Sequence, residues 1–163
     1  MAASTPLKVG VIGPKGQCGS CVVEELLFRG HEVTGISRNP PKTWKHGGPG
    51  TYKAVAADLT DTESFAQVLS GGYDAIVCGY APSLENLETV YTEGIEAHYR
   101  IKEAVLASEH EGVFLIIGGA GSLHNKQGVC FSDEQNFVYN QWYAGFTCKI
   151  SKLLSGADIR RPE

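Results

Sequence analysis

The chain has 163 residues, which is enough for one hydrophobic core and too few for two ordinary domains, so we expect a single domain over residues 1–163. The formal net charge of -4 argues against a general nucleic-acid or polyanion binder, and no apolar run approaches the ~20 residues that span a membrane. The start, MAASTPLK, lacks the apolar core of a signal peptide, and five cysteines fit reduced thiols better than a disulfide scaffold, so we expect a soluble cytoplasmic protein.

The first forty residues predict a βαβ unit around closely spaced glycines. An apolar strand, LKVGVI, leads into a turn that contains Gly13, Gly16 and Gly19. A helix follows, and a second strand, HEVTGIS, ends at Arg38. Gly13 permits the tight turn, Gly16 lets the backbone approach a pyrophosphate, and Gly19 lets the helix pack closely on the sheet. The phosphates would lie at the helix N-terminus, so the pattern is typical of a dinucleotide site.

The end of the second strand predicts which dinucleotide binds. Folds that prefer NAD usually carry Asp or Glu there to bind the adenosine ribose, whereas this chain has Ser37, Arg38 and Asn39. A guanidinium attracts a 2′-phosphate and can hold it with two hydrogen bonds, and Lys15 could add a second positive charge. We therefore expect NADP(H) rather than NAD(H). The alternative interpretation is that Arg38 and Lys15 are solvated loop charges.

The rest of the chain continues to alternate strand and helix patterns. A loop rich in proline and glycine follows Arg38, and further strands are expected at residues 52–56, 74–78 and 113–117. A Ser/Thr-x-x-Glu capping box at Thr60 and Glu63 predicts the start of a helix that stops at Gly71. Longer helical patterns cover residues 84–108 and 133–154. Five apolar strands with helices between them predict an α/β fold with a doubly wound parallel sheet in the order 3-2-1-4-5.

Four ordered stretches are together more specific than any one of them. They read VGVIGPKGQCGS, GHEVTGISRNP, AADLTD and VFLIIGGAGSL. With them the chain resembles the atypical short-chain dehydrogenase/reductases, a group with NmrA-like and flavin-reductase (biliverdin-reductase-B-like) members. The resemblance implies a Rossmann fold and NADP(H) binding. By position it implies that the cofactor is surrounded by Gly13, Lys15, Gly16, Gln17, Cys18, Gly19, Arg38, Asp58, Leu59, Gly79 and Tyr80, with Gly118, Gly119 and Ala120 at the nicotinamide end.

The chain departs from that family in two places. Family members commonly read Gly-Ala-Thr-Gly in the turn, whereas Pro14 and Lys15 stand here, and Pro14 removes one backbone donor. Family members also continue into a substrate-capping region, which we expect to be abbreviated here after about residue 124. The ending SGADIRRPE resembles a shortened sixth strand. A compact enzyme, a truncated paralogue and a shortened chain are all compatible with it.

The residues that would carry chemistry are less determined than those that would bind a cofactor. The Tyr-x-x-x-Lys pair of ordinary short-chain dehydrogenases is absent. Ser122 and His124 follow the fifth strand, at the edge where open α/β folds place their ligands, and Tyr143 is the next candidate. The alternative interpretation is that Ser122 caps a loop or helix and His124 is solvated.

Three further features have structural explanations beside functional ones. Cys18 and Cys21 form a Cys-x-x-Cys at a helix N-terminus, which could be a redox pair, but the glycine turn already explains the spacing. His98 lies on the apolar stripe of the long helix and is expected to be a buried core or interface histidine. An uncovered sheet edge and the aromatic segment near the C-terminus predict a homodimer, with Tyr139, Trp142 and Tyr143 at or beside the interface.

Three functions from different classes remain open. The first is an NADPH-dependent reductase that acts on a small conjugated or aromatic carbonyl-type molecule. The second is an isomerase or rearrangement enzyme on the same fold, for which the missing Tyr-x-x-x-Lys pair leaves room. The third is an NmrA-like regulatory protein that senses NADP without turnover, which the absence of a strong acid/base pair supports.

Overall fold

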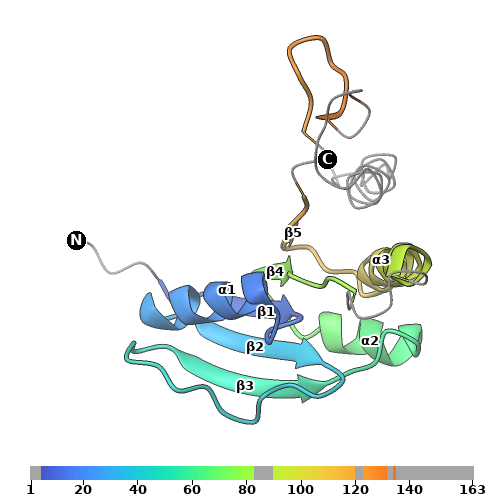
Figure 1. Ribbon diagram of the computed structural model, residues 1–163. Coiled ribbons are helices and arrows are strands. Elements are labelled where there is room, and N and C mark those ends of the chain that lie inside the picture. The colour runs from blue at the N-terminus through green and yellow to red at the C-terminus, as the bar shows by residue number, and fades with distance from the viewer. Residues whose placement is uncertain (1–4, 83–89, 120–122, 132–133, 135–163) are drawn as a thin grey trace. The chain divides into compact units, whose positions relative to one another are not determined.

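The computed structural model describes residues 5–82, 90–119, 123–131 and 134. Its strands are β1 (Lys8–Ile12), β2 (Glu32–Ser37), β3 (Thr51–Ala56), β4 (Ala75–Cys78) and β5 (Val113–Ile116). Its helices are α1 (Gln17–Phe28), α2 (Thr62–Leu69) and α3 (Val90–Ala107). The five strands form one parallel sheet in the order β3-β2-β1-β4-β5, which confirms the predicted topology (Figure 1).

The described residues fall into two compact units. The first is drawn from residues 1–81 and 103–117 and contains the whole sheet with α1 and α2. The second is drawn from residues 82–102 and 118–163 and contains most of α3. Among the described residues, no helix is long and apolar enough to cross a membrane.

The central strands are buried because both of their faces are covered. Four of the five residues of β1 and four of the six of β2 are buried, as is usual for parallel strands between helices. In the register of this pair, Val9 lies beside Val33 and Val11 beside Gly35. Side chains of consecutive residues alternate between the two faces, so every second residue of β1 contributes to the same core.

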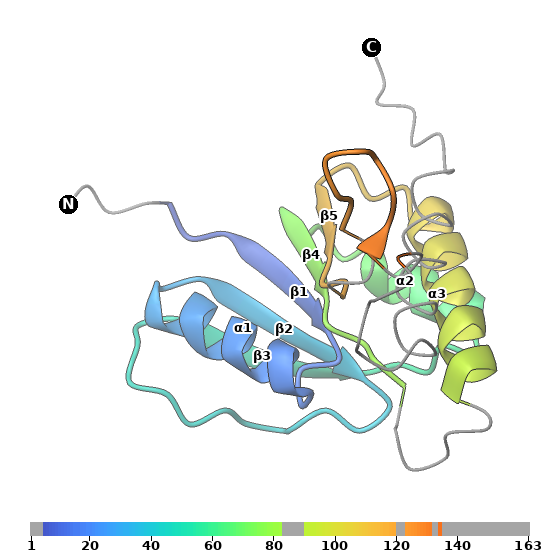
Figure 2. The same ribbon diagram turned by 45° about the horizontal axis from the view of Figure 1, so that its top comes forward.

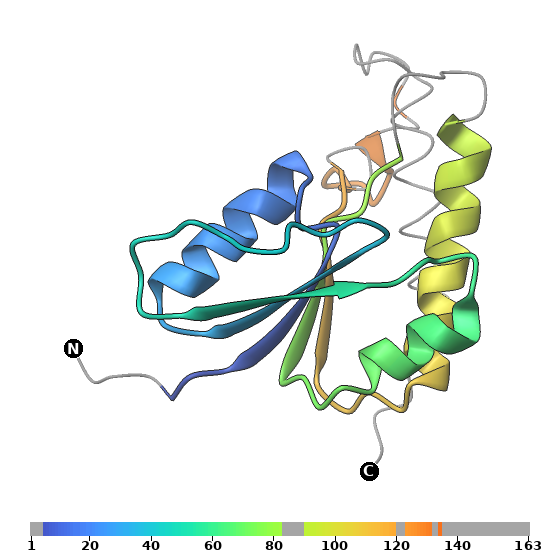
Figure 3. The same ribbon diagram turned by 90° about the horizontal axis from the view of Figure 1, so that it is seen from below.

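One core lies between the sheet and α1. It is formed by Val9, Val11 and Val33 of the sheet together with Val23 and Leu27 of α1. Val23 and Leu27 are four residues apart and therefore share one helix face. Figure 2 and Figure 3 show α1 lying over β1 and β2, while α2 is on the opposite side of the sheet.

Helix α2 begins one residue later than the capping box predicts. Its N-cap is Asp61, whose Oδ1 accepts the backbone N–H of Ser64 at 3.0 Å. Thr60 does not cap the helix because its backbone N–H and its hydroxyl both donate to Oδ1 of Asp58, each at 2.9 Å. The predicted capping box is thus wrong in detail, although the helix itself and its end near Gly71 are confirmed.

The long predicted helix is confirmed as α3, and its predicted first residues, 84–89, lie outside the described residues. His98 is buried, with Nδ1 at 2.7 Å from the carbonyl oxygen of Gly94, as expected for a core histidine. Burial lowers the pKa of His98 because it disfavours the charged imidazolium. The helix expected at 133–154 also lies outside the described residues, apart from Glu134.

Candidate cofactor-binding site

The glycine turn joins the end of β1 to the start of α1 in a conformation that glycine favours. Gly13 has a φ of 77°, in the left-handed region. Its N–H donates to the carbonyl oxygen of Ile36 at 3.0 Å, and its own carbonyl accepts the N–H of Gly16 at 3.1 Å. The turn is therefore closed on itself and also fastened to β2, the strand that precedes Arg38.

Gly19 lies against this turn with no room for a side chain. A Cβ placed on Gly19 would overlap the carbonyl oxygen of Gly13 and would approach Cα of Pro14 to 3.3 Å. Gly79, which follows β4, is similarly close, since its own Cβ would lie 3.2 Å from Cα of Gly19. The first turn of α1 thus packs directly on the backbone of two strand ends, which is the role predicted for Gly19.

The N-terminus of α1 has the features of an anion-binding position. Gly16 is the N-cap and provides no side-chain hydrogen bond, and the first turn contains no acidic residue. The first amides of a helix have no partner within the helix, so here they are available to a phosphate. Lys15, Gln17 and Cys18 are exposed around this end, whereas Pro14 is fully buried and contributes packing instead of a donor. The presence of Pro14 in the turn therefore does not remove the helix amides that are available to a phosphate.

The carboxyl ends of the strands bring the other predicted residues to the same edge of the sheet. Arg38 follows β2 and is exposed, and Asp58 and Leu59 follow β3 closely. Gly79 and Tyr80 follow β4, and the N–H of Gly79 donates to the carbonyl of Ile12 at 2.9 Å. The order of the strands reverses between β1 and β4, and ligands of open α/β sheets bind in the crevice at such a point.

The charges at this edge differ in their availability. Arg38 makes no ion pair with any carboxylate of the described residues, so its guanidinium can meet a ligand. Asp58 is engaged by Thr60, which places its carboxylate in the turn that precedes α2. Leu59, which stands between Asp58 and Thr60 in the sequence, is half-buried and offers only backbone and apolar surface. Among the described residues, the edge therefore presents the unpaired cation of Arg38 after β2 and the hydrogen-bonded carboxylate of Asp58 after β3.

The residues after β5 are described in part. Gly118 and Gly119 follow the strand after Ile117, and Ala120, Ser122 and Tyr143 lie outside the described residues. His124 is exposed, and its Nε2 lies 3.3 Å from Sγ of Cys130. A β-bridge between the same two residues closes a short loop.

The loop between His124 and Cys130 is organised by Asn125. The Oδ1 of Asn125 accepts the backbone N–H groups of Gln127 and Val129, both at 2.9 Å, and its Nδ2 donates to Glu134 at 2.6 Å. The sequence reasoning missed Cys130 as a neighbour of His124. The signal was present, since Asn125 and Gly128 (φ 78°) are residues that favour a tight turn between two short arms.

This geometry agrees with the comparison with known protein families. Residues 13–150 match a family described as NAD(P)H-binding. The chain belongs to this family. Its cofactor is accordingly a nicotinamide dinucleotide, and the resemblance to atypical short-chain dehydrogenase/reductases is confirmed.

Three known proteins show what this NAD(P)H-binding protein is similar to. The uncharacterized protein YwnB of Bacillus subtilis is 30% identical over 123 residues, which are 72% of this chain and 49% of YwnB. A candidate NADH-flavin reductase from Streptococcus pneumoniae is 26% identical with a TM-score of 0.70, over 91% of this chain and 65% of its own. A candidate epimerase from Bacteroides thetaiotaomicron is 28% identical with a TM-score of 0.69, over 91% of this chain and 64% of its own. This chain thus spans about half of the curated relative and less than two thirds of these two solved chains.

Together the fold and the family show a protein that binds a nicotinamide dinucleotide. The arrangement of the glycine turn is compatible with that conclusion at the level of individual contacts. The room at Gly16, the close packing at Gly19 and the uncapped N-terminus of α1 are what a pyrophosphate requires. The chain's own residues therefore fit the cofactor that the family binds.

Proposed function

We propose that the chain is an NADP(H)-dependent reductase of a small conjugated or aromatic carbonyl-type molecule. The observation that carries the cofactor preference is Arg38, an exposed cation without an ion-pair partner among the described residues, at the end of the strand to which the glycine turn is hydrogen-bonded. An acid at this position would bind the ribose of NAD, whereas a guanidinium favours a 2′-phosphate. The candidate NADH-flavin reductase among the structural neighbours supports reduction of a conjugated ring as the class of reaction.

Different residues would bind different parts of the dinucleotide. The amides of Gln17 and Cys18 at the start of α1 would hold the pyrophosphate above Gly16, with Lys15 beside it. Arg38 would bind the 2′-phosphate, and the backbone at Asp58 and Leu59 would border the adenine. Gly79 and Tyr80 would also border the dinucleotide. Its nicotinamide end would be lined by Gly118, Gly119 and Ala120. When bound, the nicotinamide supplies a hydride, and these residues supply orientation.

The proton that completes a carbonyl reduction would come from a polar side chain after β5. We propose His124 for this role, with Ser122 and Tyr143 as further candidates. The exposed imidazole of His124 can donate a proton to a substrate, and its Nε2 lies 3.3 Å from Sγ of Cys130.

A second candidate function is an isomerisation without net redox change. The likeness to the candidate epimerase from Bacteroides thetaiotaomicron favours it, as does the absence of the Tyr-x-x-x-Lys pair. A third is NADP sensing without turnover, in the manner of NmrA-like proteins, for which the same absence is the support. We also propose that the protein acts in the cytoplasm, because Cys18 and Cys21 are exposed free thiols three residues apart on α1.

We propose in addition that two copies form a homodimer. The support is β5, which pairs only with β4 within the described residues and exposes Val113 and Leu115. The aromatic segment expected at the interface, including Tyr143, lies outside the described residues.

The deciding experiment is a binding titration with NADPH, NADP⁺, NADH and NAD⁺, followed by panels of carbonyl compounds, quinones and flavins. Consumption of NADPH with a conjugated carbonyl or flavin supports the reductase. It is followed by the loss of absorbance of the reduced nicotinamide at about 340 nm. Binding of NADP(H) without any turnover would favour the sensor. Incorporation of solvent deuterium into a substrate without net NADPH consumption would favour the isomerase.

A further inference from the structure

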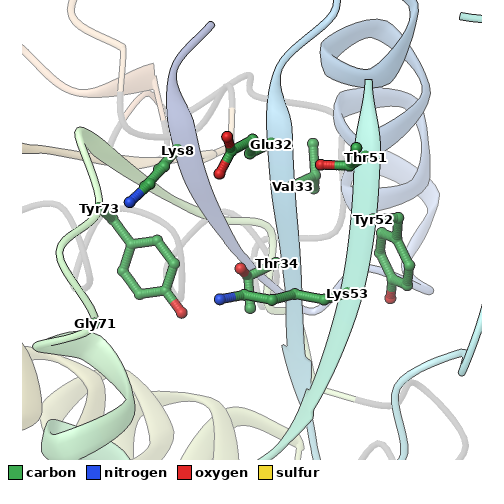
Figure 4. A pocket seen from close by; sticks show the side chains of 9 residues that line it. All are labelled: Lys8, Glu32, Val33, Thr34, Thr51, Tyr52, Lys53, Gly71 and Tyr73. Atoms are coloured by element: carbon green, nitrogen blue, oxygen red, sulfur yellow. The ribbon is translucent and has the colours of Figure 1, made fainter. Parts of the chain in front are cut away.

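A hollow lies at the other end of the sheet from the glycine turn. It has a volume of about 280 Å³ and is lined by residues at or near the beginnings of β1, β2 and β3 and by the segment before β4 (Figure 4). The lining residues are Lys8, Glu32, Val33, Thr34, Thr51, Tyr52, Lys53, Gly71 and Tyr73. The cofactor edge is formed by the carboxyl ends of these parallel strands, so the two sites are separate.

The register of the strands explains why the surface is hollow here. Gly10 of β1, Thr34 of β2 and Lys53 of β3 lie side by side in one row across the sheet. Gly10 has no side chain to fill its place in the row. The ring of Tyr73 lies over it, since a Cβ on Gly10 would be 3.6 Å from a carbon of that ring. The hollow therefore has an aromatic wall on one side and a row of polar groups on the other.

The floor of the hollow is made of hydroxyl groups. Thr34 is 3% exposed and Tyr73 is 8% exposed, and their hydroxyl groups are neighbours. Burial raises the pKa of Tyr73, so its phenol remains protonated at neutral pH and can act as a donor. Figure 4 shows the ammonium group of Lys53 extending toward these two hydroxyl groups.

The row nearer the strand starts adds charges of both signs. Lys8, Glu32 and Thr51 lie side by side there, and all three are exposed. Among the described residues no ion pair joins Glu32 to Lys8 or Lys53. Asp74 is nearby in a different role, because its Oδ2 accepts the backbone N–H of Lys8 at 2.7 Å. Of the charged side chains that line the hollow, two are cations and one is an anion, which favours a ligand with one negative charge over a dianion.

We propose that this hollow binds a small monocarboxylate, whose carboxylate is held by the ammonium of Lys53 and the hydroxyls of Thr34 and Tyr73 and whose apolar body lies on the Tyr73 ring. A carboxylate accepts several hydrogen bonds in one plane, which matches a cation and two adjacent hydroxyls. The volume lies just below that of pockets for drug-sized molecules, so the ligand is a small acid. The site is independent of the proposed reductase activity.

The test is a titration of the ¹⁵N-labelled protein with sodium benzoate, followed by the amide signals of residues 32–34, 51–53 and 71–73. We expect saturable shifts at these amides with benzoate and none with benzamide, its neutral analogue, or with inorganic phosphate at a pH above its second pKa, where it is a dianion. Lys53→Met keeps the length of the side chain and removes its charge, and it should weaken benzoate binding about tenfold or more. Lys45→Met, an exposed lysine outside the hollow, should leave benzoate binding unchanged.

Tyr73→Phe provides a second variant that keeps the aromatic wall and removes one donor, and it should weaken benzoate binding several-fold. The proposal is overturned if benzamide shifts the same amides as strongly as benzoate, if phosphate competes with benzoate there, or if Lys53→Met binds benzoate as the unmodified protein does. NADPH binding should be the same in Lys53→Met and in the unmodified protein. Failure at this hollow is thereby distinguished from failure at the cofactor site.

Discussion

The N–H of Gly13 donates a hydrogen bond to the carbonyl oxygen of Ile36 at 3.0 Å. This bond joins the phosphate-binding turn to β2 two residues before Arg38. Because β1 and β2 are also paired in register from Lys8 to Ile12, the turn and the start of the Arg38 loop belong to one rigid piece of backbone. The pyrophosphate position proposed at the turn and the 2′-phosphate position proposed at Arg38 would therefore be held at a fixed spacing before any ligand binds.

The first prediction concerns Arg38 and the choice of cofactor. We expect Arg38→Gln to lower NADPH affinity about 10- to 100-fold, because a charge-assisted hydrogen bond to phosphate is lost, with little effect on NADH affinity. Arg38→Asp should reverse the preference, since a carboxylate repels the 2′-phosphate and accepts from the ribose hydroxyl of NADH. Fluorescence titration with both cofactors measures this. Arg29→Gln, at the far end of α1, is the matched control and should bind as the unmodified protein does. Equal affinities of the unmodified protein for NADPH and NADH would contradict the prediction.

The second prediction is that Gly16→Val abolishes cofactor binding and preserves the fold. Gly16 has extended backbone angles (φ -64°, ψ 161°) that valine adopts readily. A Cβ there would meet the carbonyl oxygens of Gly13 and Gly79 at 3.4 and 3.5 Å, which are ordinary contacts. The added methyl groups would instead fill the space of the pyrophosphate. Circular dichroism should be unchanged while NADPH titration shows no saturation.

Gly47→Val is the control for this change. Gly47 lies in the exposed loop between β2 and β3, with nothing within 4 Å of an added Cβ. Its variant should bind NADPH normally. If Gly16→Val also binds normally, the turn is not the phosphate cradle.

The third prediction separates packing from binding at Gly19. In an exposed helix, replacing glycine by alanine would stabilise by about 1 kcal/mol. Here the new Cβ would overlap the Gly13 carbonyl and lie 3.0 Å from its carbon, and both atoms are backbone that cannot rotate away. We expect Gly19→Ala to lower the free energy of unfolding by about 2–3 kcal/mol, measured by urea denaturation. A more stable Gly19→Ala variant would show that the helix is not packed this closely on the turn.

The sequence predicted the sheet because its signals are local. Each strand is a short apolar run, and the glycine spacing marks the strand, turn and helix that bind a dinucleotide. The capping of α2 was predicted one residue too early because Thr60 and Asp61 are both good N-caps, and the choice between them depends on the carboxylate of Asp58 engaging Thr60. Such competition between side chains cannot be resolved from propensities alone.

The candidate site was predictable only in part for a similar reason. Gly13 and Gly19 follow from what backbone geometry demands, and the contacts around them agree with the tight turn and the close helix packing predicted there. The His124 and Cys130 contact depends on how a short loop closes, and the hollow at Lys53 depends on register between three strands. Register is a tertiary property, so a single lysine in β3 carries no local sign of it.

The fourth prediction concerns Tyr52, whose buried hydroxyl has no hydrogen-bond partner among the described residues. Its ring packs against Trp44 with centroids 5.5 Å apart, and burial raises the pKa of its phenol. Tyr52→Phe keeps the ring and removes an unsatisfied polar group, so it should raise the free energy of unfolding by up to about 1 kcal/mol. Tyr73→Phe is the contrasting variant, because the Tyr73 hydroxyl interacts with the side chain of Thr34 and its removal should cost about 1 kcal/mol. Urea denaturation of both variants measures whether their changes in the free energy of unfolding have opposite signs. A lower free energy of unfolding for Tyr52→Phe as well would show that the Tyr52 hydroxyl has a partner such as water.

The fifth prediction is that the chain is a homodimer in solution and that β5 contributes to the interface. Val113 and Leu115 are 63% and 49% exposed and lie two residues apart, so both project from the same face of a strand that is the edge of the described sheet. Light scattering coupled to size exclusion should give the dimer mass at micromolar concentration. Leu115→Lys places a charge on this face and should shift the equilibrium toward monomer by about tenfold or more in dissociation constant. Phe28→Lys, a change at an isolated exposed residue on α1, should leave the dimer intact. A monomer in the unmodified protein, or equal dissociation of the two variants, would remove β5 from the interface and leave the exposed pair as ordinary surface.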